Sequence, residues 1–477
     1  MKLEKLLNIL CYVGVFFLIY SILAFVLIGV SRIVGEFELV SIILLPTLVV
    51  LALGLVLFIG LRKWLLVEMP IGAAMALIGL AWLILPLLST MPFIMVGGLD
   101  FFSAFFEAMS GYTTTGLTMY ADVESLPRSI LFWRSFMQWI GGIGILALFV
   151  TIFSRRSPVL RRLYVAEGRA DTVNFDVVNT SRRVWLFYGA VTLFCFILLY
   201  RAGMPLFDSL NHAFTGLATG GFSVKNGNIG AYDNLRVEII LMIFLCVGAT
   251  NFVYMITQID IQMRRLRKKT LRKWELNVEL KGFLLLILFA IVTLTLVGKE
   301  DLRSASFQAI SAITNCGFQT RILVGWSDFN KMILSLLMIA GGSSGSTAGA
   351  VKIFRVEIFF LSVYWYFKRL MLPEHAVFTK RFGKRDTSYE ETVHVIQYII
   401  VYLLFLMGGA MALTASGHSF VNSFFEVASA IGNTGLSVGI TSVGMPASHK
   451  LLLTFEMWFG RVEIFPALIL LLYPLRR

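Results

Sequence analysis

Four short segments of the sequence place a glycine among small polar residues, in a pattern suited to holding a dehydrated cation. They are residues 112–118, 217–223, 313–319 and 431–437, aligned on Gly116, Gly221, Gly317 and Gly435. In each segment Leu or Phe follows the glycine, and a hydroxyl or amide residue comes next. A permeating ion gives up water oxygens, and backbone carbonyls replace them only where the chain turns them inward, which glycine permits because it has no Cβ. No segment holds an ionised side chain, which favours a monovalent over a divalent cation.

The candidate cation ligands are the glycine of each segment and the two residues before it. They are Thr114, Thr115, Gly116, Thr219, Gly220, Gly221, Asn315, Cys316, Gly317, Asn433, Thr434 and Gly435. In a single segment, such a glycine would more simply cap a helix or allow close packing. Four aligned copies favour the ion-binding interpretation. We interpret the Cys316 side chain as a small polar filler and not as a ligand.

A short helix is expected before each glycine segment. Sixteen residues before the aligned glycines stand N-cap or first-turn residue types, namely Asp100, Pro205, Asp301 and Ser419. A helix of about three turns is too short to cross a bilayer, so the chain must enter, descend and return through the glycine segment. Irregular backbone at that depth survives only where it lines a water-filled cavity or is buried in protein. Four such units would form a pore, with the negative helix C-termini directed at its centre.

The composition places the chain in a membrane. Apolar residues make up 58% of the 477 residues, charged residues 14%, and the mean hydropathy is +0.82; soluble domains are more polar. Ten apolar runs reach spanning length, near residues 9–30, 39–61, 69–91, 129–153, 184–204, 235–257, 280–298, 331–365, 393–415 and 449–473. The first run is too long for a cleaved signal peptide, and we expect it to stay in the mature chain. Four scattered cysteines suggest neither disulfides nor a zinc site.

The net charge of +13 predicts the orientation of the chain. Lys and Arg are concentrated in three loops on one side of the membrane, residues 154–183, 259–281 and 366–392. The positive-inside rule makes that side cytoplasmic, together with both termini. The basic loops fit either anionic lipid head groups or docking of a cytosolic partner, and no nucleic acid is expected.

The predicted fold is an all-α polytopic membrane protein with ten transmembrane helices. Four pseudo-symmetric repeats, each a span, a short helix, a glycine segment and a span, surround one pore after an N-terminal pair of helices. The predicted boundaries are 1–65 for the two-helix extension and 66–165, 166–270, 271–385 and 386–477 for the repeats.

One predicted span is interrupted by ten consecutive small residues, 341–350. They begin with Gly341, Gly342, Ser343, Ser344, Gly345, Ser346, Thr347, Ala348 and Gly349. A helix-packing face is the alternative, but such a face needs larger residues between the small ones. The composition instead predicts an unwound segment within the membrane.

The sequence resembles the Trk/Ktr/HKT superfamily of potassium transporters, in particular the bacterial TrkH-type membrane subunit. The resemblance covers nearly the whole chain, including the segments 133–144, 163–168, 341–352 and 460–465. It implies one pore per chain in the bacterial inner membrane, with K+ held at the glycine segments and no cofactor. It also implies homodimers and a cytosolic, nucleotide-binding subunit of TrkA type. In this superfamily a serine at the first glycine accompanies sodium permeation, so Gly116 favours potassium.

The resemblance implies that the unwound segment crosses the pore below the glycine segments as a gate. Arg461 lies 26 residues after Gly435, as Ser343 does after Gly317, which puts both at one depth. An intramembrane Arg costs at least ~2.5–3.5 kcal/mol and needs partners. We predict that Arg461 holds the gate closed and repels cations, with support from Lys352. The alternative is a structural ion pair with Glu463 or Glu357.

Two acidic residues, Glu107 and Glu426, occupy matching positions in their short helices, where the other repeats have His212 and Gln308. They either concentrate cations near the glycine segments or brace the short helices by hydrogen bonds.

The predicted function is selective potassium uptake through a gated pore, driven by the membrane potential. The alternative is a symporter that couples K+ to H+ or Na+, which requires a titratable residue or second ion site near the membrane midplane. No catalytic constellation supports an enzyme. The glycines at 141–144 lie within a span and do not form a dinucleotide site.

Overall fold

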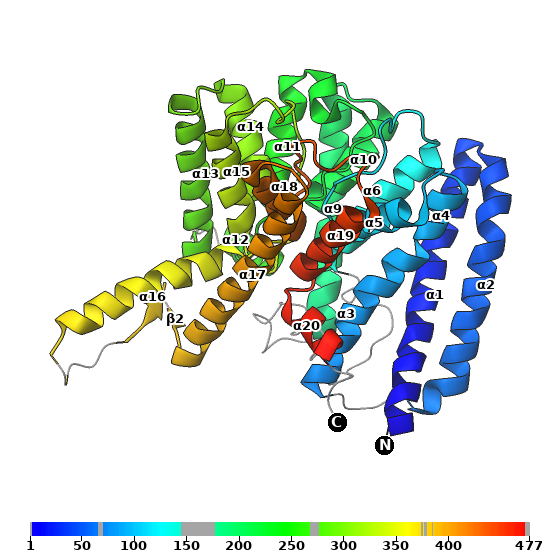
Figure 1. Ribbon diagram of the computed structural model, residues 1–477, viewed down its shortest axis with the longest axis horizontal. Helices are drawn as coiled ribbons and strands as arrows, with labels where there is room; N and C mark the ends of the chain where they lie inside the picture. The colour runs from blue at the N-terminus through cyan, green and yellow to red at the C-terminus, as the bar shows by residue number, and fades with distance from the viewer. Residues whose placement is uncertain are drawn as a thin grey trace.

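The computed structural model describes residues 2–64, 70–144, 177–267, 276–373, 375, 379–383 and 385–472. Six of its helices are long and apolar enough to cross a membrane, judged by length and composition within the described part of the chain. They are α1 (Lys2–Val34), α2 (Phe37–Leu61, continued by the 3₁₀ turn η1, Arg62–Trp64), α3 (Ile71–Leu88, followed by α4, Thr90–Met95), α9 (Val177–Arg201), α13 (Val278–Leu296) and α17 (Tyr389–Ala415). Figure 1 shows α1 and α2 side by side at one edge of the molecule, with α13 on the opposite side and α16 (Ile353–Met371) projecting beyond it.

Several predicted spans are not single helices. The run 235–257 forms α11 (Leu235–Gly248) and α12 (Phe252–Arg267), which meet at an angle of 98° and count as a seventh span if taken as one. The run 331–365 forms α15 (Asp328–Ala340) and α16 (Ile353–Met371), and the run 449–473 forms α19 (Ala447–Arg461) and α20 (Phe465–Leu472). Hydropathy predicts that a segment lies in the membrane but does not predict whether its helix is continuous. The fourth predicted span begins as α6 (Arg128–Ile143) and runs on into residues 145–153, outside the described part.

Four short helices begin at the predicted residues. They are α5 (Phe101–Tyr112), α10 (Leu206–Leu217), α14 (Leu302–Ile313) and α18 (Phe420–Ile431), each of 12 residues. Their N-caps are the predicted Asp100, Pro205, Asp301 and Ser419. Except at the proline, the cap side chain accepts a hydrogen bond from a first-turn N–H, which explains why the helix starts there. Twelve residues rise ~18 Å, well short of the ~30 Å hydrocarbon core.

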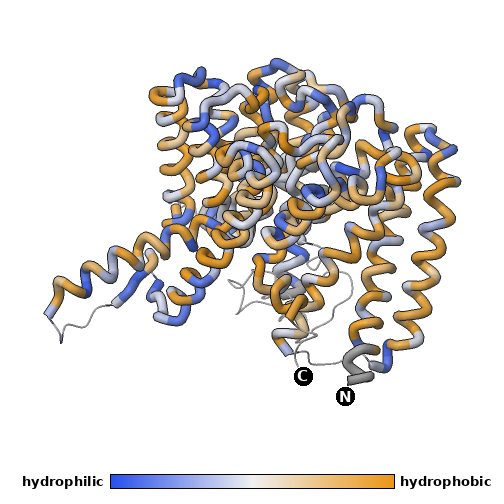
Figure 2. The backbone as a smooth tube through the Cα atoms, in the orientation of Figure 1, coloured by the Kyte–Doolittle hydropathy of each residue, from blue (hydrophilic) through white to orange (hydrophobic). Residues whose placement is uncertain are grey.

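The outer surface is apolar, as a lipid environment requires. In Figure 2 hydrophobic colour runs along the outer helices, and polar colour gathers toward their ends. Along α13, Leu285 is 65% exposed and Leu296 is 75% exposed. The buried core lies between α3, α5, α6, α18 and α19, where Trp82, Trp133 and Trp458 are among the largest fully buried side chains.

A two-stranded antiparallel hairpin departs from the predicted all-α fold. Strand β1 (Arg381–Phe382) pairs with β2 (Arg385–Asp386), with Arg381 opposite Asp386. Besides η1, the described residues contain one further 3₁₀ helix, η3 (Asn228–Tyr232). Most of the first basic loop, part of the second, and the segment 163–168 lie outside the described residues, and the predicted repeat boundaries stay predictions.

Candidate functional site

The four glycine segments adopt one backbone conformation. The aligned glycines have φ of 90°, 77°, 82° and 93° in chain order, and the residues two before them, Thr114, Thr219, Asn315 and Asn433, have φ of 57°, 52°, 55° and 54°. Left-handed backbone is uncommon outside glycine and is a strain for β-branched threonine. The residue between these two positions, such as Thr115 in the first segment, does not have a left-handed backbone. The backbone handedness therefore alternates over three consecutive residues. Recurrence of this strained pattern in four copies indicates a conformation held for function.

The segments form a closed ring of contacts. A Cβ added to any of the four glycines would overlap a carbonyl oxygen of the following segment, and the fourth segment contacts the first. The overlaps are Gly116 with Gly220, Gly221 with Cys316, Gly317 with Thr434, and Gly435 with Thr115. In every case the carbonyl belongs to the residue just before the next glycine. The structure therefore brings together all twelve of the candidate ligand residues around one axis, and no side chain fits at the glycine positions.

Two asparagines tie neighbouring segments together. The Asn315 Nδ2 atom donates to the Thr434 hydroxyl at 2.9 Å, and the Asn433 Nδ2 atom donates to the Thr115 hydroxyl at 3.2 Å. Each amide also donates to a backbone carbonyl of the next helix, α15 for Asn315 and α19 for Asn433. The amide oxygens of both residues are buried and have no hydrogen-bond partner. These two oxygens are free to accept a bond from water or to contact a cation.

Gln138 of α6 fixes the second segment. Its Nε2 atom donates to the Gly220 carbonyl at 2.6 Å, and its Oε1 atom accepts from the Phe222 N–H at 3.1 Å. Sequence reasoning did not assign this role, because the contact joins residues 82 positions apart and no local pattern marks it.

The acidic residues of the short helices act as braces. Glu107 accepts hydrogen bonds from Thr118 and the Met119 N–H and forms an ion pair with Arg134 at 2.7 Å. Both charged side chains are almost fully buried, at 0% and 2% exposed. Because the carboxylate is saturated by protein donors, the contacts favour the bracing interpretation over cation attraction.

A hydrogen bond of the same kind occurs in two other short helices, each time to a residue eleven positions later in the chain. Glu426 accepts from the Ser437 hydroxyl at 2.7 Å, and His212 lies 3.0 Å from the Ser223 hydroxyl. The hydroxyl residue that ends the first, second and fourth glycine segments is therefore the partner of the short helix before it. The third segment differs, because both polar atoms of buried Gln308 lack a hydrogen-bond partner.

Removing the first brace should destabilise the protein strongly. Glu107→Ala leaves the Arg134 guanidinium buried without its carboxylate, and breaking a buried pair in this way costs ~3–5 kcal/mol. Thermal unfolding of the purified protein in detergent should show a clear drop in midpoint, larger than that of Gln308→Ala, which removes an amide without bonding partners. Equal midpoints for the two variants would contradict the brace.

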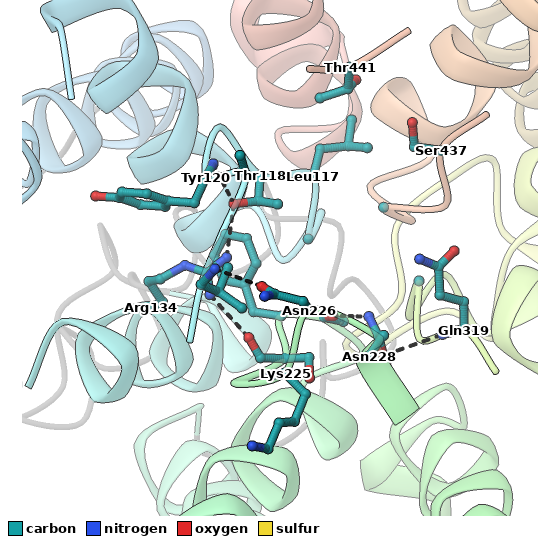
Figure 3. Close-up of a pocket in the computed structure, with 18 residues that line it drawn as sticks. Leu117, Thr118, Tyr120, Arg134, Lys225, Asn226, Asn228, Gln319, Ser437 and Thr441 are labelled. Carbon is teal, nitrogen blue, oxygen red and sulfur yellow. Dashed lines mark hydrogen bonds between the residues drawn. The ribbon is translucent and has the colours of Figure 1, made fainter. Parts of the chain in front are cut away.

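A cavity of about 160 Å³ opens on the outer side of the ring and is lined by all four glycines. Figure 3 shows Arg134, Asn226, Asn228 and Gln319 around it. The Arg134 guanidinium stacks 4.0 Å from the Phe222 ring, and Glu107 balances its charge. Polar groups line this mouth, so a hydrated cation can approach the ring.

The rim of this cavity is held by an exposed ion pair. Lys225 Nζ lies 3.0 Å from Glu124, and this hydrogen bond holds the pKa of the Glu124 carboxyl below its usual range. The carboxylate therefore stays ionised at neutral pH, and the Lys225 charge is balanced at the rim.

Residues 341–350 are not helical, as predicted, and the non-helical stretch continues to residue 352. It lies at the break between α11 and α12, where helix-terminal carbonyls need donors. The Ser343 N–H donates to the Ala249 carbonyl at 2.8 Å, and the Thr347 N–H donates to the Gly248 carbonyl at 3.1 Å. The Thr347 hydroxyl lies 3.1 Å from the Thr219 hydroxyl, so the segment contacts the inner side of the ring.

The segment also approaches the unpaired amide oxygens. A Cβ on Gly341 would lie 2.9 Å from the Asn315 Oδ1 atom, and one on Gly349 would lie 2.9 Å from the Asn433 Oδ1 atom. The small residues predicted from the sequence therefore pass directly under the third and fourth glycine segments.

Arg461 connects this segment to the first glycine segment and to the end of α6. Its guanidinium donates to the Thr347 carbonyl at 2.8 Å, to the Thr114 hydroxyl at 3.2 Å, to the Gly142 carbonyl at 3.0 Å and to the Gly141 carbonyl. Lys352 Nζ donates to the Ala348 carbonyl within the segment.

Glu463, one of the two carboxylates considered as an ion-pair partner of Arg461, lies beside another arginine. Glu463 forms a salt bridge with Arg355 at 2.6 Å. Arg461, Lys352 and Glu463 line a second cavity, on the inner side of the segment.

Spanning helices around four short helices, with a ring of backbone carbonyls between them, define the class of an α-helical membrane transport protein. The chain belongs to the TrkH family of cation transport proteins, which it matches over residues 49–474. This confirms the resemblance drawn from the sequence.

Individual relatives agree with this assignment. The chain is 31% identical over 409 residues to the Trk system potassium uptake protein TrkH of Salmonella typhimurium, covering 82% of this chain and 83% of that protein. It is 31% identical over 394 residues to an uncharacterised cation transporter of Methanocaldococcus jannaschii, covering 82% and 80%. The crystal structure of the potassium transporter TrkH from Vibrio parahaemolyticus matches with a TM-score of 0.84 at 26% identity, covering 100% of both chains.

Proposed function

We propose that this protein carries K+ into the cell through a gated pore whose selectivity filter is the ring of the four glycine segments. The observation that supports this proposal most strongly is that each filter glycine contacts a carbonyl of the next segment, and the fourth segment contacts the first. Carbonyl oxygens packed around one axis replace the hydration shell of a cation. The Trk relatives named for potassium uptake support K+ as that cation.

The filter suits a monovalent ion that is transported and not retained. The twelve filter residues include no ionised side chain, so the ion meets partial charges only. The described residues contain no cluster of three or more His, Cys, Asp or Glu that could hold a metal ion. The binding groups of this proposal are thus backbone carbonyls with hydroxyl and amide oxygens, and K+ is the cargo.

The segment 341–349 is the gate of this pore. It passes beneath the filter, and Arg461 holds one of its carbonyls while Lys352 holds another. Two cationic side chains at this depth also repel a cation that has passed the filter. The arrangement therefore corresponds to a closed pore.

The proposal extends to the setting of the pore. Four pseudo-symmetric repeats surround it in a cytoplasmic membrane, with both termini inside. Two copies form a homodimer, and a cytosolic nucleotide-binding subunit of TrkA type regulates the flux. Relatives named as Trk system proteins and the basic end of α12, with Arg264, Arg265 and Arg267, support this setting.

Symport of K+ with H+ or Na+ is the second candidate function. One observation favours it: Glu456 of α19 is a buried carboxyl within the helical bundle. Reconstituted protein that accumulates Rb+ against its electrochemical gradient when a proton or sodium gradient is imposed would establish symport. Flux that always follows the electrochemical gradient of Rb+ would exclude it.

Ion flux in liposomes tests the potassium filter. The wild type should pass Rb+ in strong preference to Na+, and Gly116→Ser should reduce that preference because a side chain at this position displaces the Gly220 carbonyl. Ser125→Gly, a change on the exposed outer loop, is the control and should keep the wild-type preference. Equal Rb+ and Na+ flux through the wild type would overturn the assignment.

A further inference from the structure

One carboxyl inside the helical bundle has no role in the filter or the gate. Glu456 lies in α19 and is 3% exposed. Its Oε2 atom is buried and has no hydrogen-bond partner within the part of the chain that the structure describes. An unpaired carboxylate in an apolar interior is so unfavourable that the group takes up a proton. Glu456 is therefore held in this arrangement as the neutral acid.

The Glu456 carboxyl lies between α17, α18 and α19. A Cβ on Gly409 of α17 would lie 2.8 Å from the Glu456 Oε1 atom and 2.9 Å from Val427 of α18. The hydroxyls of Tyr402 and Tyr398, one turn apart on α17, are buried and have no hydrogen-bond partner. The unpaired Oε2 atom of Glu456 can bind a proton.

The position of Glu456 along α19 connects it to both the filter and the gate. The next residue, Met457, accepts a hydrogen bond through its carbonyl from the Asn433 amide of the filter at 2.8 Å. Five residues after Glu456 comes Arg461, which holds the Thr347 carbonyl of the gate. A charge at Glu456 therefore acts first on the adjacent Met457 carbonyl, which anchors the filter, while Arg461 lies more than one turn further along α19.

Most of the other titratable groups near α19 have hydrogen-bond partners or lie at the start of α17. On the packed helices and on α19 itself they are Tyr389, Tyr398, Tyr402, Glu390, Glu391 and His394 of α17, Glu426 of α18, Asp100, Glu107 and Tyr112 at α5, and His449, Lys450 and Arg461 of α19. Glu426 and Glu107 are saturated by the braces described above, and Asp100 caps its helix. His449 bonds to the Ser416 hydroxyl, and Lys450 donates to Ser103. The hydroxyls of Tyr402 and Tyr398 have no hydrogen-bond partner.

We propose that Glu456 is a proton-binding site and that its occupancy sets the potassium flux. With the proton bound, α17, α18 and α19 pack as seen and Met457 keeps Asn433 in place. Loss of the proton leaves an unpaired charge between these helices, which disfavours this packing and disturbs the filter anchor. The protonated form is favoured at low pH and lost as the pH rises. This inference rests on the proposed transport function.

The test compares the pH profiles of Rb+ flux in liposomes for the wild type and Glu456→Gln, whose neutral amide imitates the protonated acid. Wild-type flux should fall toward alkaline pH by about fivefold or more, the size of an ordinary coupling between sites. Glu456→Gln should keep its flux over the same range. Glu390→Gln, the same chemical change at the exposed start of α17, is the matched control and should follow the wild type.

An infrared measurement decides the proton site without any flux. The carbonyl stretching band of a protonated carboxyl should be present in the wild type at neutral pH, disappear on alkaline titration, and be weaker in Glu456→Gln by the contribution of one carboxyl. Absence of this band from the wild type overturns the site, and an identical flux profile for wild type and Glu456→Gln overturns its effect on transport. Failure of the wild type to pass Rb+ at all would instead contradict the proposed function.

Discussion

Gly317→Ala should nearly abolish Rb+ flux. The glycine has a φ of 82°, which an L-residue adopts only under strain, and the new Cβ would overlap the carbonyl oxygen of Thr434. The obstacle is backbone and cannot rotate away, so the ring must open at the junction of the third and fourth segments. A displacement of about 1 Å in a preorganised site can cost about 100-fold in rate, and we expect a loss of this order in reconstituted protein.

Gly325→Ala is the matched control for this change. Gly325 has no atom within 4 Å of an added Cβ, and its φ is not left-handed. The control should conduct like the wild type. A Gly317→Ala protein that folds, passes Rb+ at the wild-type rate and still rejects Na+ would show that the ring is not the filter.

Arg461→Ala should raise the flux through the unstimulated pore. The guanidinium donates to a carbonyl of the gate and, at the same time, to carbonyls at the end of α6, so it ties the gate to a fixed helix. A hydrogen bond to a charged group contributes ~1.5–3 kcal/mol, and losing one should favour the open state by roughly tenfold or more. The substitution also removes a positive charge from the path of the ion. Rb+ uptake into liposomes without any regulatory subunit is the measurement.

Arg461→Lys separates the contribution of the hydrogen bonds from that of the positive charge. Lysine keeps the charge but has a compact ammonium that cannot span the same set of acceptors, so its flux should lie between those of the wild type and the alanine variant. Arg236→Ala, at an exposed site at the start of α11, should have no effect. Uptake by Arg461→Ala that is no faster than wild type would count against a closing role.

The starts of the short helices could be predicted because the signal is local. An Asp or Ser side chain that binds the first-turn N–H groups is visible at one position of the sequence, as at Asp301 and Ser419. The unwound segment was likewise predicted from its own composition. The glycine alignment indicated which residues meet, since four copies of one pattern imply one environment.

Contacts between distant segments could not be predicted in this way. The bend between α11 and α12 depends on the gate donating to the carbonyls of Gly248 and Ala249 about a hundred residues earlier in the chain. Gln138 looks like any polar residue in a span until the second segment is placed beside it. For Arg461 the depth argument indicated the gate as a partner, but the end of α6 as a second partner depends on how the helices pack.

The hydrogen bonds made by the closed gate indicate which backbone oxygens its opening would expose. Ser343, Thr347 and Arg461 together occupy backbone oxygens of Gly248, Ala249 and Gly142 on the inner side of the filter. In the proposed pore, withdrawal of residues 341–349 would leave these oxygens without their protein donors at the place where an ion regains its hydration shell. Water or the departing K+ can then bind to these backbone oxygens. The surface that binds residues 341–349 in the closed state would thus help the ion to rehydrate in the open pore.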